Sequence, residues 1–98
     1  MEIEFDDPVY DRLETDPAFT TGFARPIVSL YRRRLQLIRA ATDERAFYAL
    51  TSLHFEKLQG SRQGQYSMRL NAQWRLILRL EQRDSGKVVA VVGIEDYH

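Results

Sequence analysis

Hydrophobic and polar residues alternate with a period of two in several parts of the chain, and this period predicts strands. Positions 1–6 alternate between apolar and acidic residues, as expected for a half-buried strand. The same alternation returns over 66–70 and, for a longer stretch, over 74–81. A nearly continuous apolar run over 88–94 predicts a last strand that lies inside the sheet with both faces covered.

Between these strands the apolar residues follow a helical period. Asp7-Pro8 favours a helix start, and Asp16-Pro17 favours its end. A second helix is expected to start near Arg25-Pro26, with one apolar stripe formed by Ile27, Leu30, Tyr31, Leu35, Ile38 and Ala41. A third helical segment is expected to reach Leu50.

The order of these elements predicts the fold class. One strand is followed by helices, and then by three strands joined by a short connection at 71–73 and a polar loop at 82–87. We therefore expect a single α+β domain over residues 1–98, with N-terminal helices packed on one face of a largely antiparallel sheet.

The net charge of the chain is zero, but the charges are unevenly distributed. Residues 1–16 carry seven acids and one base, and residues 17–98 carry the compensating positive excess. Twelve of the 14 basic residues are arginine, whose planar guanidinium matches phosphate with two parallel bonds. A basic body favours a polyanion partner such as RNA, and the alternative is that these arginines form ordinary surface ion pairs.

The sequence gives little support for a membrane, disulfide or metal protein. No apolar run approaches the roughly 18–20 residues that a membrane span needs, and cysteine is absent. The acidic first residues are unlike a secretory signal. Only two histidines are present, without metal-ligand spacing. We therefore expect a cytoplasmic protein with no membrane partner, no metal and no cofactor.

Four polar residues follow the last predicted strand, and the final three are Asp96, Tyr97 and His98. If the two preceding strands pair, Arg69 and Arg75 share the sheet face opposite the apolar residues. The loop that contains Arg62 opens onto the same hairpin. The sequence therefore predicts a basic sheet surface with proton-transferring groups at its edge.

Such a surface suits RNA cleavage without a metal. In that reaction a ribose 2′-hydroxyl attacks the adjacent phosphate, a base takes its proton, and an acid protonates the leaving oxygen. Arginines stabilise the extra negative charge of the transition state. Histidine is a natural acid or base near neutral pH, and an aromatic ring such as that of Tyr97 can stack on a base.

Residues 58–75 read Leu-Gln-Gly-Ser-Arg-Gln-Gly-Gln-Tyr-Ser-Met-Arg-Leu-Asn-Ala-Gln-Trp-Arg. This block resembles the centre of HigB toxins, the host-inhibition-of-growth branch of the RelE/ParE superfamily. Those proteins typically show Leu-Lys-Gly-Asp-Arg, then Gly-Gln-Tyr-Ser, Arg, Asn and Trp-Arg at this spacing. Many of them also end as this chain does, on Asp-Tyr-His, so the resemblance covers roughly residues 53–98.

The resemblance implies a small RelE-like, or microbial-RNase-like, α+β fold. It also implies the toxin of a type II toxin–antitoxin system, a ribosome-dependent endoribonuclease that cleaves messenger RNA and arrests translation. A cognate HigA-like antitoxin with a helix-turn-helix domain is the expected partner, in a hetero-oligomeric complex.

Site residues follow from the matching positions. The resemblance implies phosphate binding by Arg62, Arg69 and Arg75, and a C-terminal group formed by Asp96, Tyr97 and His98, with His98 as the general acid. A histidine found in some relatives aligns with Glu56, and His54 lies two residues earlier. Glu56, His54 and Asp96 therefore all stay candidates for the base or for the residue that orients it.

The chain also departs from the family pattern. Gln59 stands where a lysine is frequent, and Gln63 stands at a commonly basic position. Lys57 compensates only if it points to the same face as the arginines. This loss of charge keeps a second possibility open, a non-catalytic inhibitory toxin that binds another target such as DNA gyrase or a ribosome-assembly component.

Overall fold

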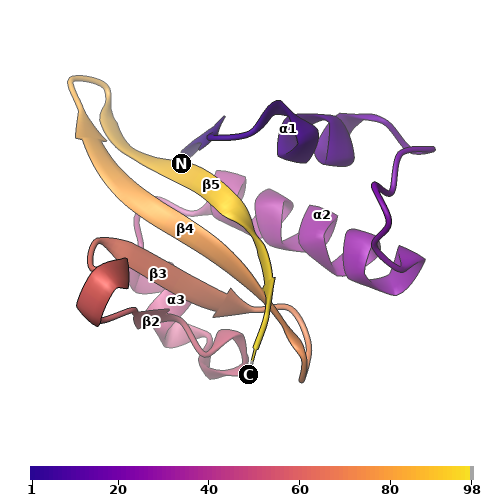
Figure 1. Ribbon diagram of the computed structural model, residues 1–98. Helices are drawn as coiled ribbons and strands as arrows, with labels where there is room; N and C mark the ends of the chain where they lie inside the picture. The colour runs from indigo at the N-terminus through magenta and orange to yellow at the C-terminus, as the bar shows by residue number, and fades with distance from the viewer. Residues whose placement is uncertain (98) are drawn as a thin grey trace.

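The computed structural model describes residues 1–97 and contains one five-stranded sheet with the order β1-β5-β4-β3-β2 (Figure 1). The strands are β1 (Glu2–Phe5), β2 (Glu56–Lys57), β3 (Gln65–Arg69), β4 (Trp74–Arg83) and β5 (Gly86–Asp96). β1 runs parallel to β5, and the other neighbours are antiparallel. The expected α+β class with a largely antiparallel sheet is confirmed.

Helices α1 (Pro8–Thr15), α2 (Arg25–Ala40) and α3 (Arg45–Ala49) lie between β1 and β2 in the chain. Asp7 caps α1 as expected, because its Oδ1 accepts from the amide of Val9 at 2.9 Å. α2 has Pro26 in its first turn and buries its apolar stripe against the sheet. Figure 1 shows α1 and α2 on the same side of the strands.

Two tyrosines connect the helices to β5. The buried Tyr31 hydroxyl of α2 donates to the carbonyl of Tyr10 at 2.8 Å, and burial raises the pKa of Tyr31. The Tyr10 hydroxyl in turn accepts from the amide of Ile94 at 3.2 Å. A side chain at position 93 would have its Cβ 3.1 Å from this hydroxyl, so Gly93 permits the close approach. These contacts fix the helix layer against the strand that leads to Asp96.

The structure differs from the sequence prediction at two connections. The expected loop at 82–87 is largely strand, because β4 reaches Arg83 and β5 begins at Gly86, which leaves a tight turn. The part of the chain after Leu50, which the sequence pattern did not assign, contains a 3-10 turn η1 (Thr51–Leu53) and the short edge strand β2. A second 3-10 turn, η2 (Gly60–Arg62), lies in the loop that contains Arg62.

Of the helices within residues 1–97, none combines the length and the apolar character that a membrane crossing requires.

Candidate functional site

The outer face of the sheet, which faces away from α2, brings two arginines of the sequence prediction together. In the register of β3 and β4, Arg69 lies directly opposite Arg75. In the register of β4 and β5, Arg75 lies opposite Glu95. Since directly opposite residues share a sheet face, the three side chains form one row across the sheet. The expected placement of Arg69 and Arg75 on one face is therefore confirmed.

Arg75 is the residue of this row with unsatisfied hydrogen-bond donors. Its Nε and Nη1 atoms are buried and have no hydrogen-bond partner among residues 1–97. Its guanidinium carbon lies 4.2 Å from the centroid of the Tyr97 ring, in a cation–π arrangement. A guanidinium can only donate, so these buried N–H groups favour an anionic acceptor.

The unsatisfied donors of Arg75 line a cavity of about 160 Å³, which we call the Arg75 cavity. The hydroxyl of the buried Ser67 also has no hydrogen-bond partner among residues 1–97. The cavity is lined by Leu58, Arg62, Ser67, Arg75, Ile77, Glu95, Asp96 and Tyr97. Buried polar groups are normally hydrogen-bonded, and an oxyanion in this cavity would satisfy both the guanidinium and the hydroxyl.

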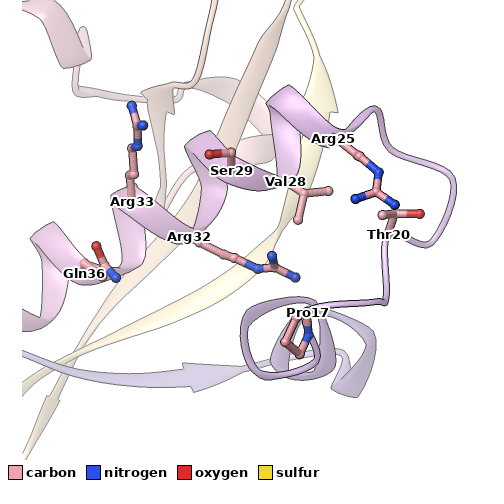
Figure 2. Close-up of a pocket in the computed structure, with 8 residues that line it drawn as sticks. All are labelled: Pro17, Thr20, Arg25, Val28, Ser29, Arg32, Arg33 and Gln36. Carbon is pink, nitrogen blue, oxygen red and sulfur yellow. The ribbon is translucent and has the colours of Figure 1, made fainter.

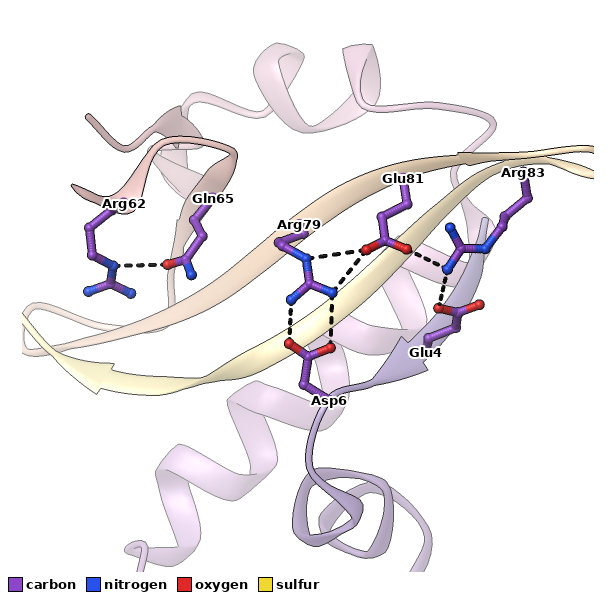
Figure 3. Close-up of polar contacts among 7 residues, drawn as sticks. All are labelled: Glu4, Asp6, Arg62, Gln65, Arg79, Glu81 and Arg83. Atoms are coloured by element: carbon purple, nitrogen blue, oxygen red, sulfur yellow. Dashed lines mark hydrogen bonds and ion pairs between the residues drawn. The ribbon is translucent and has the colours of Figure 1, made fainter. Parts of the chain in front are cut away.

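Arg62 reaches the same cavity but is already paired. Its two terminal nitrogens each donate to one oxygen of Glu95 at 2.7 Å. Its Nε donates to Gln65 at 2.9 Å (Figure 3). The hydrogen bonds from the Arg62 guanidinium lower the pKa of Glu95 below its ordinary value. Arg62 is thus in the predicted place with its charge neutralised.

His54 and Glu56 both lie near the arginine row. His54 adopts a left-handed conformation with φ of 46° at the end of η1, a conformation that is uncommon outside glycine. Its Nε2 atom lies 3.4 Å from Nη1 of Arg69. Glu56 lies opposite Ser67 in the register of β2 and β3, and so on the same face. The structure places both candidates on this face, and His54 is the one in contact with an arginine.

The C-terminal residues are held at the β3–β4 connection. Asp96 lies opposite Trp74 and accepts a hydrogen bond from the side chain of Gln73 at 3.1 Å. The amide of Tyr97 donates to the carbonyl of Gln73 at 2.6 Å, while the residue is 54% exposed. Asp96 and Tyr97 are therefore beside Arg75, as expected. His98 lies outside the described residues.

Lys57 does not join the arginines. It lies opposite Tyr66 in the register of β2 and β3. Since Tyr66 packs against the hydrophobic core, this register assigns Lys57 to the opposite face from Arg69. The condition for compensation by Lys57, that it point to the same face as the arginines, is therefore not met, because successive side chains of a strand alternate between faces.

Two members of the Arg75 cavity, Glu95 and Ser67, were missed as site residues. Neither residue belongs to the site that the sequence predicts. The alternation of residues on β3 already put Ser67 beside Arg69, so that signal was available. The pairing of Glu95 with Arg62 joins residues 33 positions apart and has no local signal. Within residues 1–97, no group of three or more histidine, aspartate or glutamate side chains is arranged to hold a metal ion.

Comparisons with known proteins bear on the family and on the fold. A family model described as the RelE-like toxin HigB of type II toxin–antitoxin systems matches residues 4–98, which confirms and extends the resemblance seen in residues 53–98. Comparison with curated proteins gave no match.

Solved structures share the fold at low sequence identity. A YoeB/ParE toxin from Agrobacterium tumefaciens matches with a TM-score of 0.64 and 18% identity, covering 100% of both chains. The YoeB–YefM complex from Staphylococcus aureus gives 0.58 and 19%, covering 100% of this chain and 97% of that chain. The RelBE2 toxin–antitoxin complex from Mycobacterium tuberculosis gives 0.51 and 14%, covering 98% and 96%. These likenesses concern the fold.

Proposed function

Because the chain belongs to the HigB-like family of RelE-like toxins from type II toxin–antitoxin systems, we propose that it is a metal-free, ribosome-dependent endoribonuclease that cleaves messenger RNA and arrests translation. The observation that carries this proposal is the Arg75 guanidinium. Its buried, unsatisfied donors line a cavity that is also lined by Ser67, Asp96 and Tyr97, and its guanidinium lies over the Tyr97 ring.

In the proposed reaction, the ribose 2′-oxygen forms a bond to phosphorus and the bond from phosphorus to the 5′-oxygen breaks. The products are a 2′,3′-cyclic phosphate and a 5′-hydroxyl. A base removes the proton of the 2′-hydroxyl, and an acid delivers a proton to the leaving 5′-oxygen. Arg75 and Arg69 hold the non-bridging phosphate oxygens, whose negative charge increases in the transition state. Tyr97 stacks on a neighbouring base of the substrate.

The acid is assigned from the sequence, and the base is assigned from the structure. His98 is the proposed acid, from its place in the terminal Asp-Tyr-His sequence. His54 is the favoured base. When Arg69 donates across the 3.4 Å contact, the Nε2 atom of His54 is the acceptor and carries its lone pair toward the arginine row. Glu56 and Asp96 then orient the substrate or the histidines.

An antitoxin is the proposed partner that restrains this activity. Two of the solved structures that share the fold are toxin–antitoxin complexes, from Staphylococcus aureus and Mycobacterium tuberculosis. We propose a HigA-like antitoxin with a helix-turn-helix domain, encoded next to this chain, in a hetero-oligomeric complex. Co-expression of the adjacent reading frame should restore growth; an adjacent gene that encodes no such protein would count against the proposal.

The proposal is tested by induced expression of the full chain and of a chain that lacks His98. The full chain should arrest growth and produce new 5′ ends in translated messenger RNA, mapped by primer extension. Deletion of a general acid should reduce cleavage by about 10²–10⁴-fold. Circular dichroism of the purified variant checks that the fold is kept. A truncated chain that arrests growth as strongly as the full chain would falsify the role of His98.

A second function is favoured by one specific observation. Arg62 is neutralised by Glu95 and Lys57 lies on the other face, so the charge available for a scissile phosphate is smaller than the motif implies. A non-catalytic toxin that binds a target such as DNA gyrase fits this reduced charge. Growth arrest with DNA damage and without new 5′ ends in messenger RNA would support this function over RNA cleavage.

A further inference from the structure

Helix α2 concentrates positive charge without acidic partners on the helix itself. It contains five arginines and no aspartate or glutamate. Arg39 is neutralised by Glu14, at 2.7 Å. The other four, which are Arg25, Arg32, Arg33 and Arg34, have no ion pair with a carboxylate within residues 1–97. Helix α2 therefore carries uncompensated positive charge of its own, in addition to that of Arg69 and Arg75 on the sheet.

Three of these arginines line one groove of about 430 Å³ between α2 and the segment that follows α1, which we call the α2 groove (Figure 2). It is lined by Pro17, Thr20, Arg25, Val28, Ser29, Arg32, Arg33 and Gln36. Apart from Pro17 and Val28, every lining side chain carries a hydrogen-bonding group. The groove thus offers guanidinium, hydroxyl and amide groups alongside apolar surface.

The arginines of the α2 groove divide into a structural one and two free ones. Arg32 donates to the carbonyls of Leu13 and Asp16, at 3.0 and 2.9 Å, and so fixes the end of α1 against α2. Arg25 and Arg33 are exposed and have no hydrogen-bond or ion-pair partner within residues 1–97. Burial, together with the charge of Arg33, lowers the pKa of Arg34, as expected where like charges lie close together.

Side-chain contacts link the segments around the α2 groove to those around the Arg75 cavity, although the two lie on opposite sides of the sheet. Phe23, in the segment that borders the groove, packs edge-on against Trp74 with ring centroids 5.7 Å apart. Trp74 lies opposite Asp96. Arg34 donates from α2 to the carbonyl of Arg69 at 3.1 Å. Since α2 covers the inner face and Arg75 lies on the outer face, the two cationic surfaces can contact two separate segments of RNA.

We propose that the α2 groove binds the phosphate backbone of folded RNA, at a site distinct from the one that holds the cleaved strand. Arginine, serine, threonine and glutamine are the side chains that contact phosphate and sugar oxygens without reading sequence. The side chains of Arg25 and Arg33 have no carboxylate partner within residues 1–97, so the positive charge of the groove complements a polyanion such as RNA. RNA binding by the α2 groove is inferred from the groove alone. The role of that binding, which is to hold the toxin on the RNA around a ribosome-bound messenger, rests on the proposed function.

The test compares two double variants of the full chain that lose the same charge. Arg25→Gln with Arg33→Gln removes the free arginines of the α2 groove and leaves Arg32 in place. Arg45→Gln with Arg83→Gln is the matched control. Both arginines lie outside the α2 groove, and both are already paired with carboxylates. Binding to a labelled RNA stem-loop is measured over a range of KCl concentrations, with circular dichroism as the check of folding.

We expect the groove variant to lose at least about tenfold in affinity at low salt. The slope of log K against log[KCl] should fall by about two units, since each lost phosphate contact removes a little less than one unit. The control should keep most of the wild-type slope. Equal slopes for the groove variant and the control overturn the proposal. If the groove variant keeps RNA binding but no longer binds the antitoxin, the proposal is also overturned, and the α2 groove is assigned to the protein partner instead.

Cleavage on ribosomes separates this inference from the proposed function. If the wild-type chain cleaves, the groove variant should raise KM and leave kcat near its wild-type value, and a fall in kcat with unchanged KM overturns the proposed role. If the wild-type chain does not cleave, the proposed function fails. The stem-loop measurement still decides whether the α2 groove binds RNA.

Discussion

Strand β4 carries three arginines on one face of the sheet, and the ion pairing of these arginines differs between its two ends. At the far end of the outer face, Arg79 pairs with Asp6 and Glu81, and Arg83 pairs with Glu4 and Glu81 (Figure 3). At the site end, Arg75 has no carboxylate pair within residues 1–97 and has two unsatisfied donors. The same residue type on the same strand is thus neutralised at one end and available at the other.

The acidic N-terminal segment explains this difference. β1 pairs with β5 only over Val88 to Val91, so its acidic side chains reach the far end of β4 and not the site end. Exposed ion pairs of this kind contribute little to stability, about 0–1 kcal/mol each. Their effect here is electrostatic, because they remove positive charge from the far end and leave the cations of the site end to attract a polyanion.

The largest expected effect comes from replacing one arginine at each end of β4 with glutamine, in separate variants. Arg75→Gln should reduce RNA cleavage by about 10²–10³-fold, because it removes a donor to the transition-state oxyanion. Arg79→Gln, which loses the same charge on the same strand, should stay within about twofold of wild type, because Arg79 is already neutralised. Single-turnover cleavage of ribosome-bound messenger RNA measures both.

A thermal melt of each variant guards against loss of fold as the cause. If Arg79→Gln were as inactive as Arg75→Gln, the two ends of β4 would be equivalent, and the comparison between them would be wrong. If both variants were fully active, the Arg75 cavity would not be the catalytic site.

A smaller effect is expected from freeing Arg62. Glu95→Gln removes the carboxylate that neutralises Arg62, so RNA affinity should rise a few-fold and the salt slope should increase by about 0.7 for a single strand. Glu81→Gln is the matched control at the far end. There Asp6 and Glu4 still neutralise the two arginines, so affinity should not change. An unchanged affinity for Glu95→Gln would mean that Arg62 stays unavailable to RNA for another reason.

Much of the fold was predictable because its determinants are local. The alternation on β3 and β4 put Arg69 and Arg75 on one face, and the registers confirm it. The cap at Asp7 and the apolar stripe of α2 were visible in the residues themselves. The order of the elements then gave the α+β class.

The rest depended on contacts between distant parts of the chain. The charge of Arg62 is cancelled by Glu95, 33 residues away, and that of Arg79 by Asp6, 73 residues away. Alternation also failed to place Lys57, because the two-residue strand β2 was not recognised and its register with Tyr66 decides the face. The unsatisfied donors of Arg75 follow from packing, which composition does not reveal.

The smallest expected effect concerns stability in acid and involves the Arg62–Glu95 pair alone. Arg62 lowers the pKa of Glu95 below its ordinary value of 4.5. The pair therefore contributes stability above that ordinary value and loses it as the pH falls through the lowered pKa. Since both side chains are more than a third exposed, this contribution is below about 1 kcal/mol. Urea unfolding at pH 7 should show Glu95→Gln slightly less stable than wild type, and at about pH 3 the difference should shrink. A difference that grows in acid would mean that Glu95 is stabilised by its protonated form, and that the pair with Arg62 does not hold it as a carboxylate.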